Sequence, residues 1–211
     1  MGILDDDFRD ETLVRDLRAT LGIPDDVRPE SIDVLRRLKL ARLISNFEIV
    51  DDAALPYADA RWDGSTIVVR RSVAERAASG STDDCFTIFH EVGHLLSGHP
   101  SRNRRAGSNR TQHGRLIEAD EGRADRLAMI FAAPEYLANI SLDTTASDIG
   151  ETFGLPPIYA ERRLESLKRQ FRYRHDIKRE LPKGKSTITI DTGNYDEALP
   201  AMLRNAARSK I

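Results

Sequence analysis

The chain has 211 residues, of which 40% are hydrophobic and 31% charged, and its formal net charge at pH 7 is −2. This length is enough for one domain with a sizeable core, or for one domain with a small appendage. The single cysteine excludes an intramolecular disulfide, and no segment has the apolar length of a membrane span. Residues 1–7 carry acidic side chains where a secretory signal needs basic ones, so we expect a cytoplasmic protein with no membrane contact.

Charged residues are unevenly distributed along the chain. Residues 1–30 contain nine acidic and four basic side chains, whereas residues 162–185 contain ten basic and three acidic ones. A basic run of this kind is usually the solvated face of a helix. Binding of nucleic acid through residues 162–185 is the alternative.

Hydrophobic periodicity predicts an α+β protein that begins with helices. Apolar residues with helical spacing predict a first helix through residues 13–21 and a second over residues 29–43. Two segments rich in β-branched residues, 47–50 and 66–70, predict strands, and residues 72–78 predict a short helix. The expected order is therefore helices, a small sheet, and then a helix that contains residues 90–94.

Residues 90–94 read His-Glu-Val-Gly-His. Because residues four apart share one face of a helix, both imidazoles can bind one ion while Glu91 projects beside them. Glu91 can then hold the metal-bound water and take its proton, as expected of a zinc-dependent peptidase. Ser81 and Asp84 form a helix-capping pattern, and the apolar residues that follow predict a buried helix. A metal ion satisfies these buried polar groups better than a hydrogen-bonded structural cluster would.

The second half of the chain is predicted to be mainly helical. Residues 100–115 are poor in apolar side chains and predict a surface loop, either a lid over the site or a tolerated insertion. The elements predicted after this loop are helices over residues 116–137, 145–153 and 158–171, a short strand over 187–190 and a helix over 195–208. The second and third of these helices resemble a helix-turn-helix.

A catalytic zinc ion usually takes a third protein ligand and leaves a fourth position for water. The metzincin pattern needs glycine and histidine where this chain has Ser97 and Pro100, so that class is unsuitable. His99 therefore does not complete a metzincin site. A carboxylate from the next helix is the alternative, and the candidates are Glu118, Asp120, Glu121 and Asp125.

The spacing of these acids favours Glu121 as the ligand, with Glu118 as the alternative. Glu121 and Asp125 are four residues apart on one helix face, so one can bind metal while the other accepts the N–H of a ligand imidazole. Asp125 takes that second role. Ala124 and Ala128 keep the neighbouring surface small, which lets this helix approach the first one closely.

Two segments carry a resemblance to a known family. The run His-Glu-Val-Gly-His-Leu-Leu-Ser-Gly-His over residues 90–99, followed by Glu-Gly-Arg-Ala-Asp over 121–125 and an apolar run closing at Pro134, resembles the ImmA/IrrE family of zinc metallopeptidases. The similarity spans residues 45–170 and is specific in these two motifs. Leu127 departs from the usual aromatic residue, and Arg123 from a common Glu or Gln.

The resemblance implies a zinc site and a biological role. It implies His90, His94 and Glu121 as ligands of one Zn²⁺ per chain and Glu91 as the catalytic base. It also implies a cytoplasmic endopeptidase that cleaves a helix-turn-helix transcriptional repressor, in circuits that control mobile elements, phage or stress responses.

Peptide hydrolysis also needs a donor for the oxyanion and a place for the substrate backbone. His113, Tyr136 and Tyr159 are candidate donors, although each is more commonly an ordinary surface or core residue. The strand over 66–70 is a candidate for binding substrate as an added strand. Cys85 lies five residues before His90, about 140° around a helix, so it is expected to be a buried apolar residue rather than a zinc-binding switch.

The predicted architecture is α+β: a mainly helical, zincin-like metallopeptidase domain with a small β-sheet, followed by a helix-turn-helix-like pair. The predicted divisions are a helical segment over 1–44, the peptidase core over 45–140, the helical pair with the basic run over 141–181 and a tail over 182–211. The alternative functions are a non-catalytic, zinc-containing DNA-binding regulator and a protease activated by nucleic acid or a partner. Structural zinc sites usually have four protein ligands, often cysteines, so a single cysteine favours the peptidase.

Overall fold

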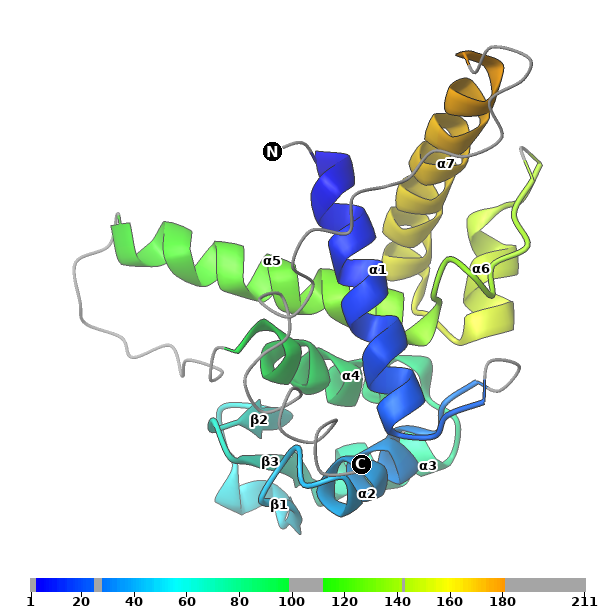
Figure 1. The fold of residues 1–211 in the computed structure, drawn as a ribbon. Coiled ribbons are helices and arrows are strands. Elements are labelled where there is room, and N and C mark those ends of the chain that lie inside the picture. The colour runs from blue at the N-terminus through cyan, green and yellow to red at the C-terminus, as the bar shows by residue number, and fades with distance from the viewer. Residues whose placement is uncertain (1–2, 25–27, 99–111, 142, 181–211) are drawn as a thin grey trace.

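The computed structural model describes residues 3–24, 28–98, 112–141 and 143–180. Within these ranges the protein is α+β and mostly helical, with one small sheet at the end opposite α7 (Figure 1). The elements are α1 (Ile3–Thr20), α2 (Ser31–Leu40), β1 (Asn46–Val50), a 3-10 turn (Asp52–Ala54), β2 (Ala60–Trp62), β3 (Thr66–Arg70), α3 (Arg71–Ala78), α4 (Thr82–Ser97), α5 (Gln112–Ala132), α6 (Ala146–Phe153) and α7 (Pro157–Glu180).

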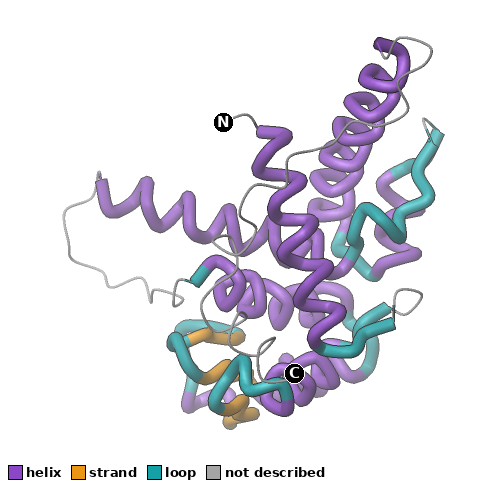
Figure 2. Tube along the Cα trace, in the orientation of Figure 1, coloured by secondary structure: helices purple, strands orange, loops and turns teal. Residues whose placement is uncertain are grey.

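The sheet has the strand order β1-β3-β2. Strand β1 pairs with β3 in parallel, and β2 pairs with β3 antiparallel, with Trp62 opposite Ile67. Ile67 and Val69 are fully buried, whereas Thr66, Val68 and Arg70, which alternate with them, are partly exposed, so one face of the sheet contacts the core. The strands form a small layer beside the helices (Figure 2).

Helix α4 lies at the centre of the molecule, between α5 on one side and α3 and β2 on the other (Figure 1). Its apolar side chains are buried in several directions, as the unbroken apolar pattern of the sequence predicts. The core joins α4 to its neighbours through fully buried residues, among them Leu17, Leu35, Leu38, Ile88, Val92, Leu127, Ile130 and Phe131. The helix with the two histidines is therefore packed into the core along most of its length.

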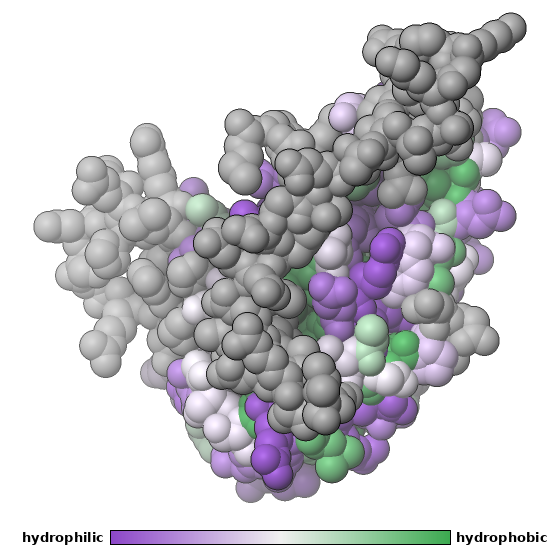
Figure 3. Space-filling view, viewed as in Figure 1, coloured by the Kyte–Doolittle hydropathy of each residue, from purple (hydrophilic) through white to green (hydrophobic). Residues whose placement is uncertain are grey.

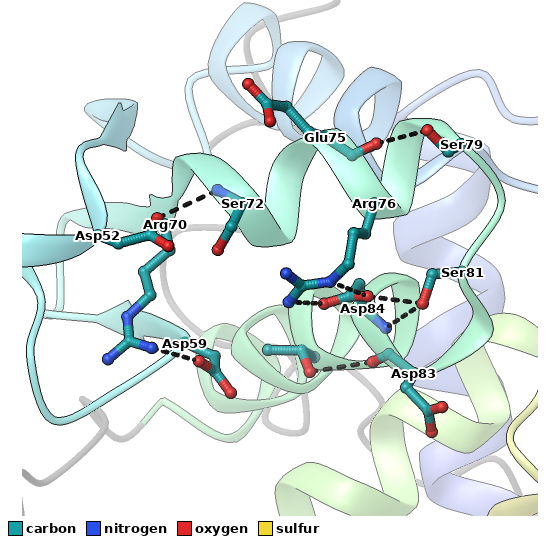
Figure 4. Close-up of polar contacts among 11 residues, drawn as sticks. Asp52, Asp59, Arg70, Ser72, Glu75, Arg76, Ser79, Ser81, Asp83 and Asp84 are labelled. Carbon is teal, nitrogen blue, oxygen red and sulfur yellow. Dashed lines mark hydrogen bonds and ion pairs between the residues drawn. The ribbon is translucent and has the colours of Figure 1, made fainter.

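The beginning of α4 is fixed by the predicted cap. The Ser81 side chain accepts a hydrogen bond from the backbone N–H of Asp84, and the Asp84 carboxylate accepts one from the Ser81 hydroxyl. Arg76 of α3 donates two more bonds to that carboxylate, at 3.0 and 2.8 Å (Figure 4). These bonds, led by those of Arg76, hold the pKa of Asp84 below its usual value. Helix α3 thus holds the N-terminus of α4.

The acidic N-terminal segment and part of the basic run meet in the fold. Helix α1 packs across α5 and lies beside α7 (Figure 1). Glu11 of α1 forms an ion pair with Arg163 of α7, which is only 1% exposed, and Asp7 pairs with Arg169. The expectation of a wholly solvated basic face is therefore wrong for Arg163, because a buried carboxylate neutralises it.

Several helix ends differ from the sequence-based expectation. Helix α2 ends at Leu40 rather than at residue 43, because Arg42 takes a positive φ of 58° and breaks the helical path. Helix α5 already begins at Gln112, so residues 112–115 are helical rather than loop, and α7 continues past residue 171. The predicted strand over 187–190 and helix over 195–208 lie outside the described residues, as does most of the predicted 100–115 loop.

Helices α6 and α7 form a connected pair. A capping box opens α6: the Thr145 side chain accepts from the backbone N–H of Asp148, and the Asp148 carboxylate accepts from that of Thr145. Gly154 ends α6 with a φ of 68°, a conformation that glycine adopts at little cost, and Pro157 opens α7. The turn is anchored in the core by Ile149, Phe153 and Leu155.

The described helices include none with the length and apolarity needed to cross a bilayer. On the face seen in Figure 3, the coloured residues intersperse hydrophilic and hydrophobic side chains. Ordinary globular surfaces have this mixed composition.

Candidate metal centre

Three side chains from two helices converge beside α4. The Nε2 atoms of His90 and His94 lie 3.1 Å apart, and Glu121 of α5 places one oxygen 3.1 Å from His90 Nε2 and the other 3.6 Å from His94 Nε2. One potential ligand atom from each residue lies within 4.8 Å of the other two. These three residues can therefore hold a metal ion.

A close contact between helices makes this convergence possible. A Cβ atom placed on Gly93, between the two histidines, would lie 2.3 Å from the backbone oxygen of Ala124. Ala124 and Ala128 are completely buried, as their small size on this helix face predicts. The backbones of α4 and α5 thus approach through Gly93 and Ala124, which brings Glu121 within reach of the histidines.

Asp125 fixes the orientation of one imidazole. Its Oδ1 atom lies 2.8 Å from Nδ1 of His90, one helical turn beyond Glu121 on α5. With Nδ1 donating to this carboxylate, Nε2 points toward Glu121 and His94. The two acids that the sequence places on one helix face therefore contact the same histidine through its two different nitrogens.

The surrounding carboxylates change the protonation of the cluster. Burial lowers the pKa of His90, but hydrogen bonds to Asp125 and Glu121 outweigh it and raise this pKa to about 10. The bonds from His90 and His94 hold the pKa of Glu121 far below its usual value. In the metal-free cluster a protonated His90 thus lies between two carboxylates, and a metal ion must displace its proton to bind Nε2.

Glu91 is buried beside the cluster and tied to the sheet. It is 5% exposed, and its Oε2 atom accepts a 2.6 Å hydrogen bond from the backbone N–H of Trp62 in β2. Burial raises the pKa of Glu91, and the charges of His90 and His94 and the Trp62 N–H oppose that rise. A carboxylate held in position with a raised affinity for protons has the properties of a general base.

The prediction that a substrate strand adds to residues 66–70 is wrong. Strand β3 lies in the middle of the sheet and pairs with β1 on one side and β2 on the other, so it has no free edge. Strand β2 could not be predicted from hydrophobic periodicity, because three residues are too few to show alternation. The turn Asp63-Gly64 was a usable signal, since a strand commonly precedes such a turn as well as following it.

Strand β2 is the sheet edge nearest to Glu91. Two backbone hydrogen bonds flank the β2–β3 pair: the N–H of Asp63 donates to the Thr66 carbonyl, and the N–H of Arg70 donates to the Asp59 carbonyl. Because such bonded positions alternate along an antiparallel pair, the backbone groups of Ala60 and Trp62 point away from β3. The bond from Trp62 N–H to Glu91 agrees with this direction.

The candidate oxyanion donors lie in different places. Tyr159 of α7 stacks on Phe86 with 3.7 Å between ring centroids, and burial and the nearby charge of Asp125 raise its pKa. Tyr136 lies 4.8 Å beneath the Arg15 guanidinium of α1. The side chain of His113 lies outside the part of the chain that the structure describes. Tyr159 is thus the described candidate that adjoins the acid orienting His90.

The remaining candidates lie apart from the three convergent residues. The Cys85 sulfur contacts the Ser31 hydroxyl at 3.7 Å and the Ala77 carbonyl at 3.5 Å, on the α2 and α3 side of α4. These contacts match a buried structural cysteine rather than a zinc switch. Glu118 is exposed, and neither it nor Asp120 belongs to the cluster.

Comparison of the chain with known family models, with curated proteins and with solved structures finds no match.

Proposed function

We propose that this protein is a zinc-dependent endopeptidase in which His90, His94 and Glu121 bind one Zn²⁺. The observation that carries the proposal is the convergence of two imidazoles and one carboxylate, with the buried carboxylate of Glu91 beside them. Two nitrogen ligands and one oxygen ligand suit zinc and leave a coordination position for water. This donor set is that of a catalytic rather than a structural site.

The residues around this set have distinct roles in peptide hydrolysis. When bound, zinc supplies Lewis acidity toward water and toward the scissile carbonyl. Asp125 keeps the His90 ring in its binding orientation through the 2.8 Å bond to Nδ1. Glu91 removes a proton from the attacking water and returns it to the leaving amine. Burial of Glu91 favours that proton uptake, and Trp62 holds its carboxylate in place.

An extended substrate fits beside β2 rather than β3. The outward backbone groups of Ala60 can pair with a peptide added to this edge, which lies next to Glu91. Tyr159 is the preferred oxyanion donor among the described candidates, because it lies near Asp125. His113 and Tyr136 remain predictions for that role.

The proposed substrate is a helix-turn-helix transcriptional repressor in the cytoplasm. This proposed substrate rests on the resemblance of residues 90–99 and 121–134 to the ImmA/IrrE family. It also rests on the interpretation of the α+β core as zincin-like. The fold adds one supporting fact: His90 and His94 of α4 and Glu121 of α5, one set from each motif, lie together as candidate ligands.

The α6–α7 pair favours a second candidate, a regulator that binds DNA or is activated by it. Two helices joined by a glycine turn resemble a helix-turn-helix, and the basic run begins in α7. Arg163 and Arg169 argue against this role for part of the run, since carboxylates of α1 already pair with them. Arg172 is exposed. A protease that responds to nucleic acid combines both candidates.

Cleavage of candidate repressors by the purified zinc-loaded chain tests the proposal. We expect the wild-type chain to bind one zinc ion and to cut a repressor, and Glu91→Gln to keep the zinc while losing at least about 100-fold in rate, as loss of a general base implies. Glu118→Gln, an exposed change on α5, is the matched control and should leave both unchanged. Undiminished cleavage by Glu91→Gln would refute the assignment. Salt-sensitive binding of duplex DNA without cleavage would favour the second candidate.

A further inference from the structure

We propose that Asp10 of α1 is a positioning residue for the metal centre. It binds two arginines of α5 and thereby sets the rotation of the helix that presents Glu121. The inference rests on the proposed function, because it takes Glu121 to be a metal ligand. Nothing in the sequence motifs points to Asp10, which lies more than one hundred residues before Glu121.

Asp10 is a buried carboxylate that faces two partly exposed arginines of α5. Its side chain is 1% exposed, with Oδ2 2.6 Å from a terminal nitrogen of Arg126 and Oδ1 3.6 Å from one of Arg123. Both arginines come from α5, and their side chains are 42% exposed for Arg123 and 35% for Arg126. One buried carboxylate thus holds two neighbouring guanidinium groups of the same helix, which a single flexible surface pair does not achieve.

These contacts lie on a different side of α5 from the ligand. At about 100° per residue, Arg123 lies about 160° and Arg126 about 140° around the helix from Glu121. The backbone contact between Gly93 and Ala124 places α5 against α4. Asp10 restrains it from the side of α1, so α5 is held between two elements and its ligand face is kept toward the histidines.

Small rotations of α5 matter because ligand distances in a zinc site are held to about 0.2 Å. Glu121 is 40% exposed, so its own side chain has little packing to fix it. Its position therefore depends on the backbone of α5. Arg123 follows Glu121 by only two residues, so its contact with Asp10 restrains the part of the α5 backbone that carries Glu121.

Asp7 offers a matched comparison on the same helix. Its side chain is 3% exposed and lies 3.3 Å from Arg169, but this partner belongs to α7 and not to α5. Replacing Asp7 by Asn removes the same charge from the same helix at similar burial. If these carboxylates act only on general stability, both replacements should have the same effect. If Asp10 places Glu121, only its replacement should change metal binding.

The test compares full-length wild type, Asp10→Asn and Asp7→Asn at matched folded fraction by circular dichroism. Competition with a chromophoric chelator gives the Zn²⁺ dissociation constant, and the visible absorption of the Co²⁺ form reports the ligand geometry. We expect Asp10→Asn to weaken zinc binding about 10- to 100-fold, as loss of an outer support of a metal site does, and to change the cobalt spectrum. Asp7→Asn should retain wild-type affinity and spectrum.

Arg126→Gln tests the same contact from the side of α5 and replaces a partly exposed side chain, so it is informative if Asp10→Asn does not fold. It should weaken zinc binding in the same direction. Wild-type affinity and spectrum in Asp10→Asn or Arg126→Gln would overturn the role of Asp10 alone, as would equal losses in Asp10→Asn and Asp7→Asn. Absence of zinc binding by the wild-type chain would overturn the proposed function and this inference together.

Discussion

At the scale of single residues, the cluster balances positive and negative groups in the absence of metal. His90 contacts Asp125 through one ring nitrogen and Glu121 through the other, and both contacts favour the protonated imidazole. The same contacts orient the ring for metal binding. A proton and a metal ion therefore compete for Nε2 of His90.

This competition predicts that zinc binding releases a proton. Because the pKa of His90 is about 10, the ring is protonated at neutral pH in the metal-free protein and must lose that proton to bind zinc. The apparent zinc affinity should therefore rise about tenfold per pH unit between pH 6.5 and 8.5, the slope for one displaced proton. Titration calorimetry in buffers with different ionisation enthalpies measures the number of protons released.

Asp125→Asn provides the control for this prediction. Removal of the carboxylate that bonds to Nδ1 lowers the pKa of His90, so the pH dependence of zinc binding should become shallower. A flat affinity across this pH range in the wild-type chain would contradict the charge assignment.

At the scale of elements, the site depends on how closely α4 and α5 pack. At Gly93 the backbones of the two helices lie too close to leave room for a Cβ atom. Any side chain there must push the α5 backbone away, because backbone atoms cannot move aside as the end of a flexible side chain can. Packing and ligand geometry are therefore coupled at this position.

Gly93→Ala is predicted to damage both stability and metal binding. The added Cβ would lie 2.3 Å from the Ala124 oxygen, so we expect a loss of about 1–3 kcal/mol in the free energy of unfolding, typical of overpacking. Zinc affinity should fall as well, since α5 carries Glu121. Urea unfolding and zinc titration measure the two effects.

Gly122→Ala is the matched control on α5. A Cβ at Gly122 meets no atom within 4 Å, so this change should be neutral or stabilise the helix by up to about 1 kcal/mol. Comparable losses in both variants would show that close packing at Gly93 is not the cause.

Local patterns account for what the sequence could predict of this site. The four-residue spacing of His90 and His94, and of Glu121 and Asp125, is helical and short-range, so the sequence alone indicated which side chains share a face. The bond between Trp62 and Glu91 depends on where β2 lies against α4, and no periodicity encodes that. The early end of α2 depends on a positive φ at Arg42, which is uncommon for a residue other than glycine.

At the scale of the whole molecule, contacts between distant segments hold the site rather than the metal alone. The continuous core runs from α1 through the sheet and α4 to α7. Ion pairs of α1 with Arg126 of α5 and Arg163 of α7 join the chain's first helix to two later ones. This architecture implies a fold that forms without metal, unlike small zinc modules that unfold when the ion is removed.

Removal of zinc should therefore lower the melting temperature without unfolding the protein. A ligand at 100 times its dissociation constant adds about 2.7 kcal/mol to the stability of the native state. At about 2–4 °C per kcal/mol for a chain of this size, excess chelator should lower the melting temperature by about 5–11 °C relative to the zinc-saturated form. Circular dichroism at 25 °C should stay helical after chelation. In Glu121→Gln, which lacks one ligand, the response to zinc should largely disappear. Complete loss of helical signal on chelation would mean that the metal, and not the core, holds α4 and α5 together.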